Sequence, residues 1–557
     1  MNDRPHTNPR LPDGKFWLKS YVPGTPSEID PSQLPTLKDL CESACARYSD
    51  SPALTQGERS LSFAELEALS RSIGAWLQSV GAKKGDRVAL MLPNILEFPI
   101  ALFGALRVGM TVVNLNPMFT PSEIRQVLDD SQPVVLVTLG ALRRVIETCG
   151  SRARLRYIIT IGGGEAAAGS NSEPLDDDEC QYLDWTKAVR AISEIPLKTE
   201  RVEPTDLAFI QYTGGTTGSP KGVMLTHQNV CANILQSLAW IHPLTDRQRI
   251  LATLLPLYHI FALEGSLLLF THLGWRNVLV PDARNLPAVV AELAHHPIAF
   301  LSGVNTLFRG LLNTWDFSVL DFSQLKITLS GGMATEPHVA KRWYDITGCH
   351  ITQAWGLTET SPGACSNFPG KPFNGSVGLP MPSTEIAIKD ETGGDLPLGE
   401  VGEICVRGPQ VTPGYWQRPE DSARAFWPGA WLRTGDVGRF DEQGFVYLIE
   451  RLKDVIIVSG FKVYPQEVEA VAATYPGVLE AAATGQPDRD SSESVALFVV
   501  CTDEAIDKAE LIGHCRQFLA PYKVPRHVYV RAELPKSAVG KVLRKMLREE
   551  LLKPLVR

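Results

Sequence analysis

Between Leu37 and about Gly378 the sequence alternates short apolar runs with longer segments that carry apolar residues at helical spacing. Residues 61–81 place apolar side chains on one helical face, and residues 86–93 then form an apolar run typical of a buried strand. A second helical pattern over 98–109 and a strand pattern over 111–116 follow. This alternation predicts α/β architecture, with parallel sheets covered by crossover helices.

The pattern changes after Gly378, so the chain is expected to contain more than one domain. Its 557 residues exceed one ordinary domain of roughly 100–200 residues. Residues 383–390, 402–408 and 444–451 read as short antiparallel strands separated by turns. From Asp454 a smaller α/β pattern begins, which predicts a separate C-terminal domain with its boundary near Glu450–Lys453.

Composition excludes some classes of protein. The formal net charge of −8 argues against a protein that coats nucleic acid. The first residues are polar and lack the apolar core of a secretory signal. The ten cysteines are scattered without a C-x-x-C pair, so we interpret them as reduced thiols of a cytosolic protein. Cys41 and Cys45 are at helical spacing and should share one helix face.

The most apolar stretch, residues 250–270, is nearly long enough to span a bilayer. Pro256, His259 and Glu264 interrupt it, and a buried glutamate is costly in lipid. The favoured interpretation is therefore a buried core segment, with a membrane span as the alternative.

A glycine-rich loop is the strongest functional signal. Residues 212–222 read YTGGTTGSPKG and lie between two strand patterns, 206–212 and 223–229. The glycines let the backbone turn its amides toward an anion, hydroxyl groups add donors, and Lys221 adds a positive charge. The order of residues differs from the Walker A loop, in which Lys precedes Ser or Thr at a helix start. The loop therefore predicts a polyphosphate site of another kind.

This loop resembles the signature of the adenylate-forming superfamily, which includes acyl-CoA synthetases, beetle luciferases and peptide-synthetase adenylation domains. Further motifs that resemble the family follow in its order: LPLYHIFAL at 255–263, LSGGM at 329–333, WGLTET at 355–360, GEICVRGP and GYW within 402–416, WLRTGD at 431–436, ERLKDVIIVSGFKVYPQEVE at 450–469 and PKSAVGKVLRK at 535–545. The resemblance covers essentially the whole chain and is strongest to bacterial long-chain fatty acid–CoA ligases.

The resemblance implies an N-terminal domain over residues 1–451, built of two stacked α/β subdomains and a small β-barrel-like subdomain. It also implies a mobile α+β domain over 454–557 and a hinge at Leu452–Lys453. The implied activity is ATP-dependent ligation of a fatty acid to CoA through an acyl-AMP, with Mg²⁺ as cofactor.

The resemblance assigns the nucleotide site residue by residue. Glu359 and Thr213 are the implied magnesium ligands, Thr358 contacts the α-phosphate, and Lys541 bridges the substrate carboxylate and that phosphate. Trp355 stands where many relatives carry Tyr and is expected against adenine, whereas Asp436 binds the ribose with Arg451 beside it. The implied ATP and AMP contacts are Thr213, Gly214, Gly215, Thr216, Thr217, Gly218, Lys221, Gly331, Gly332, Met333, Trp355, Gly356, Thr358, Asp436, Arg451 and Lys541.

The same resemblance places His259, Leu263 and Gly332 at the acyl pocket, where His259 gates the carboxylate end. It also counts His259 among the catalytic residues, together with Lys541, Thr358 and Glu359. Composition by itself favours a core histidine at 259. Gly460, Phe461 and Lys462 are the implied CoA contacts. Relatives often carry Ser-Gly-Glu-x-Val-x near the CoA mouth, but residues 491–496 here read SSESVA, which leaves the backbone shape and CoA affinity open.

Two alternatives to a long-chain ligase stay open at this point. One is a CoA ligase for a shorter, branched or aromatic acid, and the other is an acyl-adenylate-binding protein without turnover. The retained Glu359, Asp436, Arg451 and Lys541 argue against the second. We expect a cytoplasmic protein that binds a fatty acid, ATP and CoA but no nucleic acid, and leave open a homodimer and peripheral contact with the inner face of the membrane.

Overall fold

The computed structural model describes residues 14–150, 154–162, 180–190, 196–213, 220–244, 247–459, 461–488, 492–502, 506–536 and 542–552. The chain divides into two compact units, each described by itself. The larger unit contains Trp17–Glu385 and Val406–Leu432. The smaller contains Met1–Phe16, Ile386–Cys405 and Arg433–Arg557. The chain passes from one unit to the other inside three strands, β17 (Glu385–Lys389), β18 (Gly402–Arg407) and β20 (Trp431–Phe440).

The N-terminal sheet of the larger unit has the strand order β7-β6-β5-β3-β4-β8-β9. Its strands pair in parallel from β7 to β8, and β9 joins β8 in antiparallel. Their bounds are β3 Arg87–Met91, β4 Thr111–Asn114, β5 Val135–Leu139, β6 Tyr157–Ile161, β7 Gln181–Asp184, β8 Leu207–Thr213 and β9 Lys221–Thr226. The parallel arrangement predicted from the alternation is confirmed.

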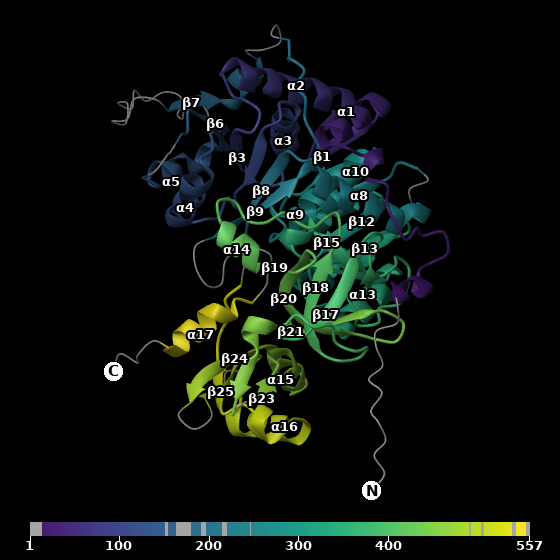
Figure 1. The fold of residues 1–557 in the computed structure, drawn as a ribbon, viewed down its shortest axis with the longest axis vertical. Helices are drawn as coiled ribbons and strands as arrows, with labels where there is room; N and C mark the ends of the chain where they lie inside the picture. The colour runs from purple at the N-terminus through teal and green to yellow at the C-terminus, as the bar shows by residue number, and fades with distance from the viewer. Residues whose placement is uncertain are drawn as a thin grey trace. The chain divides into compact units, whose positions relative to one another are not determined.

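Helices cover both faces of this sheet (Figure 1). Val88 and Leu90 of β3 belong to an apolar cluster with α1 (Leu37–Arg47), α2 (Phe63–Ser79) and α3 (Glu97–Arg107). Ala89 and Met91 point to the other face and pack with α4 (Pro121–Ser131) and α5 (Arg143–Glu147). Because successive strand residues face opposite sides, an unbroken apolar strand requires this double cover.

The central sheet of the larger unit has the order β16-β15-β14-β13-β12-β10-β11-β1-β2. Its strands are β1 Pro52–Gln56, β2 Arg59–Ser62, β10 Ile250–Thr253, β11 Arg276–Leu279, β12 Ile298–Gly303, β13 Ile327–Ser330, β14 Ile351–Gly356, β15 Gly363–Ser366 and β16 Leu379–Pro380. Further helices of the larger unit are α7 Trp185–Arg190, α8 His227–Ile241, α11 Leu286–Ala294, α12 Asn305–Leu312, α13 Pro337–Thr347 and α14 Pro419–Arg424. One apolar core contains Val88 and Phe209 of the N-terminal sheet together with Leu251 and Phe300 of the central sheet, so the two layers stack as expected.

The predicted strand over 223–229 is too long at its end. β9 stops at Thr226, and His227 begins α8. Thr226 accepts a hydrogen bond from the backbone of Asn229, whose side chain accepts one from the Thr226 backbone. This reciprocal capping satisfies backbone amides at the start of α8, so a helix begins inside the segment that was predicted as strand.

The apolar segment 250–270 is buried inside the larger unit. It forms β10, α9 (Ile260–Ala262), a π-helical turn over Leu263–Leu268 and α10 (Leu269–His272). Across the described ranges, the helices lack the length and apolar character needed to cross a membrane.

Between Gly378 and Arg451 the chain forms a sheet in which β20 pairs with β19 and with β21 in antiparallel, in line with the prediction for this region. The described strands of this sheet follow the order β17-β18-β20-β19, with β21 (Val446–Arg451) paired to β20. In the larger unit β19 (Phe426–Trp427) pairs with residues 431–432, and in the smaller unit β21 pairs with residues 436–440.

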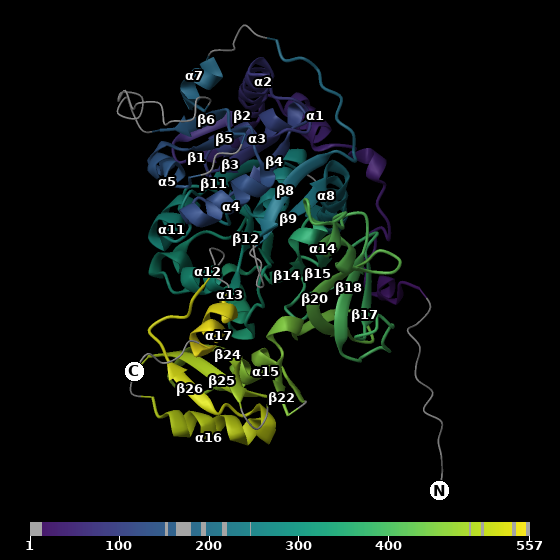
Figure 2. The same cartoon turned by 60° about the vertical axis from the view of Figure 1, so that its left-hand side comes forward.

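The C-terminal part of the smaller unit is a sheet in the order β23-β22-β25-β24, with β26 paired to β25. Its elements are β22 Ile456–Val458, β23 Phe461–Val463, α15 Pro465–Ala472, β24 Val478–Asp488, β25 Ser492–Cys501, α16 Lys508–Phe518, β26 His527–Val530 and α17 Arg544–Leu552. Apolar residues of α15 and α16 pack on one face of the sheet, whereas Leu547 of α17 packs on the other (Figure 2). The expected α+β character is confirmed, but β24 was not predicted.

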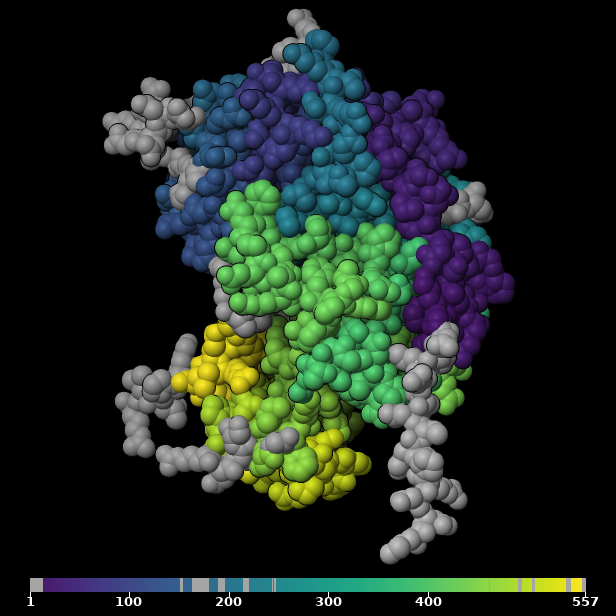
Figure 3. Space-filling view, viewed as in Figure 1, coloured from purple at the N-terminus to yellow at the C-terminus, as the bar shows by residue number. Residues whose placement is uncertain are grey.

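The N-terminal segment lies on the surface of the larger unit, where Figure 3 shows it in purple. Tyr21 donates a hydrogen bond to the carbonyl of Pro380 at 2.5 Å, and the Ser383 amide donates to the carbonyl of Ser27 at 2.9 Å. These bonds attach the segment to the end of β16 and to the loop between β16 and β17.

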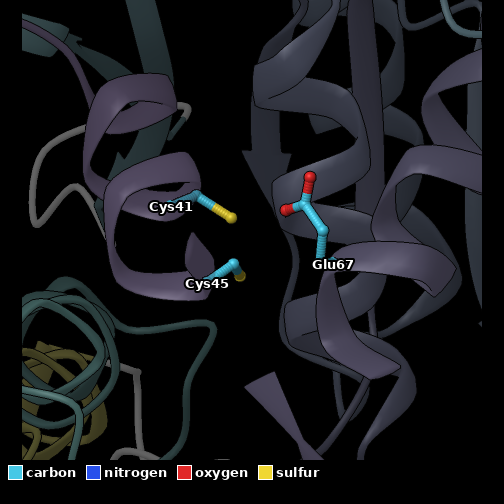
Figure 4. Close-up of side chains that lie close together, drawn as sticks. All are labelled: Cys41, Cys45 and Glu67. Atoms are coloured by element: carbon cyan, nitrogen blue, oxygen red, sulfur yellow. The ribbon is translucent and has the colours of Figure 1, made fainter. Parts of the chain in front are cut away.

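All ten cysteines lie within the described residues, and each is a free thiol. Cys41 and Cys45 share a buried face of α1, as expected from their spacing, and face Glu67 of α2 (Figure 4). The fully buried guanidinium of Arg107 donates to Cys41 Sγ at 3.3 Å and pairs with Glu67. Arg107 thereby supplies the positive charge that balances this cluster.

Replacing Arg107 with leucine should destabilise the protein by about 3 kcal/mol, because Glu67 loses the partner that compensates its partial burial. Arg71, which is half exposed and lies 3.4 Å from the same carboxylate, provides the matched control. Arg71→Leu should cost less than about 0.5 kcal/mol. Urea unfolding midpoints measure both changes, and equal shifts would contradict the role of Arg107.

Candidate active site

The ends of the glycine-rich loop are paired to each other. Thr213 is the last residue of β8, Lys221 is the first of β9, and the two are direct partners in the antiparallel ladder. Gly214, Gly215, Thr216, Thr217 and Gly218 lie outside the described residues. The pairing places Thr213 and Lys221 together at the base of the loop, where both were predicted to serve one polyphosphate.

Two further motifs emerge at one edge of the central sheet. β13 and β14 are parallel neighbours, with Ser330 opposite Gln353. Gly331, Gly332 and Met333 follow β13 directly, whereas β14 ends with Trp355 and Gly356. The carboxyl ends of parallel strands are the usual place for a ligand in such sheets, so the LSGGM and WGLTET motifs are brought to one location.

Glycine is favoured at three of these positions. Gly332 adopts φ +75°, which disfavours other residues. A Cβ at position 331 would lie 3.1 Å from the Phe261 ring, and one at 356 would collide with the Pro362 carbonyl. The backbone after both strands is therefore closely packed.

Thr358 and Glu359 lie in a short 3-10 helix, Thr358–Thr360, that follows β14. The Tyr415 hydroxyl donates a hydrogen bond to the Glu359 carboxylate at 2.9 Å, and the Thr412 amide donates to the Glu359 carbonyl at 2.8 Å. Side chain and backbone of Glu359 are thus both held by one segment, 412–415. This role of Tyr415 was missed in the sequence, although the GYW motif that contains it was noticed.

His259 is half-buried and caps the short helix α9, because its Nδ1 accepts a hydrogen bond from the Phe261 amide at 3.3 Å. The apolar surroundings lower the pKa of His259 to about 4, so the ring is neutral at physiological pH. Leu263 follows one turn later and is fully buried. The Phe261 ring packs against Gly331, which brings this segment to the turn that contains Gly332.

Glu264 is a buried acid that no site prediction included. It lies in the π-helical turn, and its carboxylate accepts a hydrogen bond from the Ser237 hydroxyl at 3.5 Å. Burial raises the pKa of Glu264 to about 8, so the carboxyl is mostly protonated at neutral pH. A π-helical turn often marks a functional position in a helix.

In the smaller unit, Asp436 and Arg451 face each other across β20 and β21. Arg451 Nε lies 2.8 Å from a carboxylate oxygen of Asp436, whose side chain is buried. The structure thus places Arg451 beside Asp436, as the sequence predicted. Leu452 and Lys453 follow in a short 3-10 helix, Leu452–Asp454, and burial next to Arg451 lowers the pKa of Lys453.

The implied CoA contacts Phe461 and Lys462 lie on β23, and Gly460 lies outside the described residues. Phe461 is exposed and stacks on Tyr522 at 4.8 Å between ring centroids. Lys462 pairs with Glu391 at 2.8 Å. Residues 492–496 of the SSESVA stretch, whose backbone shape had been left open, belong to strand β25.

Lys541 also lies outside the described residues, but the chain on either side of it is placed. Lys536 and Val542 form an antiparallel bridge, and the Leu543 amide donates to the Pro535 carbonyl at 2.8 Å. The PKSAVGK loop is therefore closed at its base, like the glycine-rich loop.

Comparison with known proteins agrees with these motifs. The model of the AMP-binding enzyme family matches residues 41–416, and the model of its C-terminal domain matches residues 467–541. The chain belongs to the AMP-binding enzyme family.

Among members of this family, a long-chain fatty acid–CoA ligase of Yersinia pestis is 43% identical, covering 97% of this chain and 98% of that protein. One of Escherichia coli O6:H1 is 42% identical, with coverage of 96% and 98%. The crystal structure of an anthranilate CoA ligase with anthranoyl-AMP matches with a TM-score of 0.83 and 27% identity, covering 94% of this chain and 99% of that one. The α/β fold, with a large N-terminal and a small C-terminal domain, is that of this AMP-binding family.

Replacing Glu264 with Gln should remove a pH dependence of stability. The folded pKa of Glu264 is raised, so its protonated form is favoured in the native state, and wild-type stability should fall as pH rises from about 4.5 to about 8. Relative to wild type, Glu264→Gln should therefore gain roughly 1.4 kcal/mol per pH unit across this window. Unfolding midpoints from pH 5 to 8.5 measure the gain, with Glu420→Gln, an exposed change, as control. Parallel profiles for wild type and Glu264→Gln would refute the raised pKa.

Proposed function

We propose that this protein ligates a long-chain fatty acid to CoA, converting ATP to AMP and pyrophosphate through an acyl-adenylate. The observation that carries the proposal is the meeting of Gly331–Met333 and Trp355–Glu359 at one sheet edge, in a chain 43% identical over nearly its full length to a ligase of that name. The proposed domains are residues 1–451 and 454–557, joined by a hinge at 452–453.

The nucleotide is held mainly through its charges. Thr213 to Gly218 and Lys221 receive the phosphates, and the turn Gly331–Met333 with Trp355 and Gly356 receives the adenine. Asp436 accepts hydrogen bonds from the ribose hydroxyls, and Arg451 fixes the orientation of that carboxylate. Loop amides and a lysine suit a polyphosphate because they offer several donors and a positive charge.

The residues present fit Mg²⁺, which prefers oxygen ligands and commonly uses one carboxylate together with substrate phosphates. Glu359 supplies a carboxylate held by Tyr415, and Thr213 supplies a hydroxyl. When bound, the ion would neutralise negative charge on the phosphates. This makes Glu359 the residue whose orientation decides how well the nucleotide is held.

In the first half-reaction a carboxylate oxygen of the fatty acid attacks the α-phosphorus, and pyrophosphate leaves. Both reactants are anions, so donors must offset their repulsion. Lys541 lies between the carboxylate and the α-phosphate, and Thr358 donates to that phosphate. The acyl chain is received by His259, Leu263 and Gly332, where a neutral histidine does not retain the carboxylate as an ion pair.

In the second half-reaction the thiol of CoA attacks the acyl carbon and loses its proton to solvent, and AMP leaves with the electron pair of the broken acyl–oxygen bond. Lys541 must be withdrawn to make room for the thiol. Rotation about Leu452–Lys453 does this and brings Gly460, Phe461 and Lys462 to CoA.

An aromatic acid is the second candidate substrate, since the solved anthranilate CoA ligase shares the fold. Its identity of 27% is well below the 43% shared with the long-chain ligase, which favours the fatty acid. Cytoplasmic location, peripheral membrane contact and a homodimer stay predictions of the sequence.

A panel of acids should separate these substrates. ATP–pyrophosphate exchange should be fastest with saturated acids of about 12 to 18 carbons, because the segment around His259 is long and apolar. Benzoate and propionate should support at least about tenfold slower exchange. Preference for either of these would overturn the proposed substrate, and the absence of exchange with every acid would overturn the reaction.

Replacing Lys541 with alanine should separate the two half-reactions. Pyrophosphate exchange should fall about 100-fold or more, since a charge aimed at the transition state is lost. Thioester formation from synthetic acyl-AMP and CoA should stay within about twofold of wild type. Lys545→Ala, a change to an exposed lysine in α17, is the control and should preserve both rates. Survival of exchange in Lys541→Ala would contradict the assigned role.

A further inference from the structure

Tyr415 stands between the two charged groups that the nucleotide site requires. Its hydroxyl donates to Glu359 Oε1 at 2.9 Å, and the ammonium of Lys221 lies 5.4 Å from the centre of its ring. Lys221 also pairs with Asp421 of α14 at 3.1 Å. One half-buried side chain thus contacts both a proposed magnesium ligand and the lysine of the glycine-rich loop.

The backbone of Tyr415 is fixed to strand β9. Val223 and Tyr415 form an antiparallel bridge, the Met224 amide donates to the Gly414 carbonyl at 3.0 Å, and the Trp416 amide donates to the Gly222 carbonyl at 2.8 Å. The segment therefore continues the hairpin that holds the glycine-rich loop. A hydroxyl mounted on such a frame has a defined position relative to Lys221.

Asp130, at the end of α4, anchors the same frame from the other side. It accepts a hydrogen bond from the Tyr212 hydroxyl at 2.5 Å and, through its carbonyl, one from Trp416 Nε1 at 3.1 Å. Arg418 also lies 3.3 Å from its carboxylate. Trp416 and Arg418, which follow Tyr415 in sequence, and Tyr212, the first residue of the loop, thus share one support.

The Tyr415 hydroxyl is a dependable donor. A tyrosine side chain carries an O–H group that can donate, so it can give a hydrogen bond to the Glu359 carboxylate, which only accepts. When a carboxylate accepts such a bond, the position of one oxygen and the plane of the carboxylate are fixed. The remaining lone pairs are oriented as a result. Partners that orient a metal-binding carboxylate commonly change metal affinity 10–100-fold when removed.

We propose that Tyr415 is a positioning residue that orients the Glu359 carboxylate for the magnesium ion of the bound nucleotide. The inference rests on the proposed function, because that function assigns Glu359 to the ion. It adds a role for the tyrosine of the GYW motif, which contacts neither substrate nor metal but sets the geometry of a residue that does.

The test compares ATP binding with and without metal. Calorimetry should give Tyr415→Phe the wild-type affinity for ATP in EDTA but an affinity about 10–100-fold weaker than wild type in saturating Mg²⁺. Tyr475→Phe is the matched control, because its hydroxyl donates to Glu510 at 3.0 Å on the surface of the other unit. This control should bind ATP as wild type does in both conditions.

A second variant keeps the inference falsifiable. In a Glu359→Gln background, Tyr415→Phe should cause less than about a twofold further loss of ATP affinity in Mg²⁺, because the tyrosine acts through the carboxylate. A full additional loss, or equal weakening of ATP in EDTA and in Mg²⁺, would show a general structural role and overturn the inference. Wild-type protein that binds no ATP in Mg²⁺ would overturn the proposed function as well. A third outcome is that the wild-type protein binds ATP in Mg²⁺ and that Tyr415→Phe shows the same metal dependence as the wild type. This outcome would overturn the role of the tyrosine and would not contradict the proposed function.

Discussion

The parallel pairing of β13 with β14 is the constraint on which the described part of the proposed nucleotide site depends. Its hydrogen bonds fix the register of the two strands, with Ser330 opposite Gln353, so their carboxyl ends open at one edge. The residues that follow have little freedom: Gly331 packs beneath Phe261, and Gly356 lies against the Pro362 carbonyl. Glu359, three residues later, is then held from both its backbone and its side chain.

Two loops that are predicted to act on the nucleotide each have paired residues at their base. Thr213 and Lys221 pair at the base of one predicted catalytic loop, and Lys536 and Val542 pair at the base of the other. Closing a loop at its base limits how far its ends can separate, whatever the residues between them do. Each loop is therefore presented by a hairpin-like support on its own unit.

Much of the fold could be predicted from local patterns. The apolar strands of the N-terminal sheet and the helix over 63–79 follow from periodicity, and the helix begins at a serine cap, Ser62. β24 was missed because its sequence, VLEAAATGQPD, is rich in alanine and contains glycine and proline, which single-strand preferences disfavour. Pairing with β25 over nearly its whole length supplies what its composition lacks.

The candidate site likewise has features that could be predicted from the sequence and features that appear only in the folded chain. The proximity of Asp436 and Arg451 could be anticipated only through the resemblance, because both residues belong to motifs of the family. The contact between Tyr415 and Glu359 joins residues 56 apart in sequence, and no periodicity encodes such a pair. The raised pKa of Glu264 likewise depends on burial among residues from several elements, which is a property of the folded chain.

The chain changes unit between Phe16 and Trp17 and again inside β17, β18 and β20, and the changes inside strands carry a consequence for protein engineering. A module attached by one linker can be exchanged by cutting a gene at a single point. Here a cut at residue 386 or 433 would divide a β-strand. It would also separate residues 386–405 from the other segments of the smaller unit. Chimeras that swap substrate preference should therefore join within the loops of one unit, or at the short helix Leu452–Asp454, where no sheet is severed.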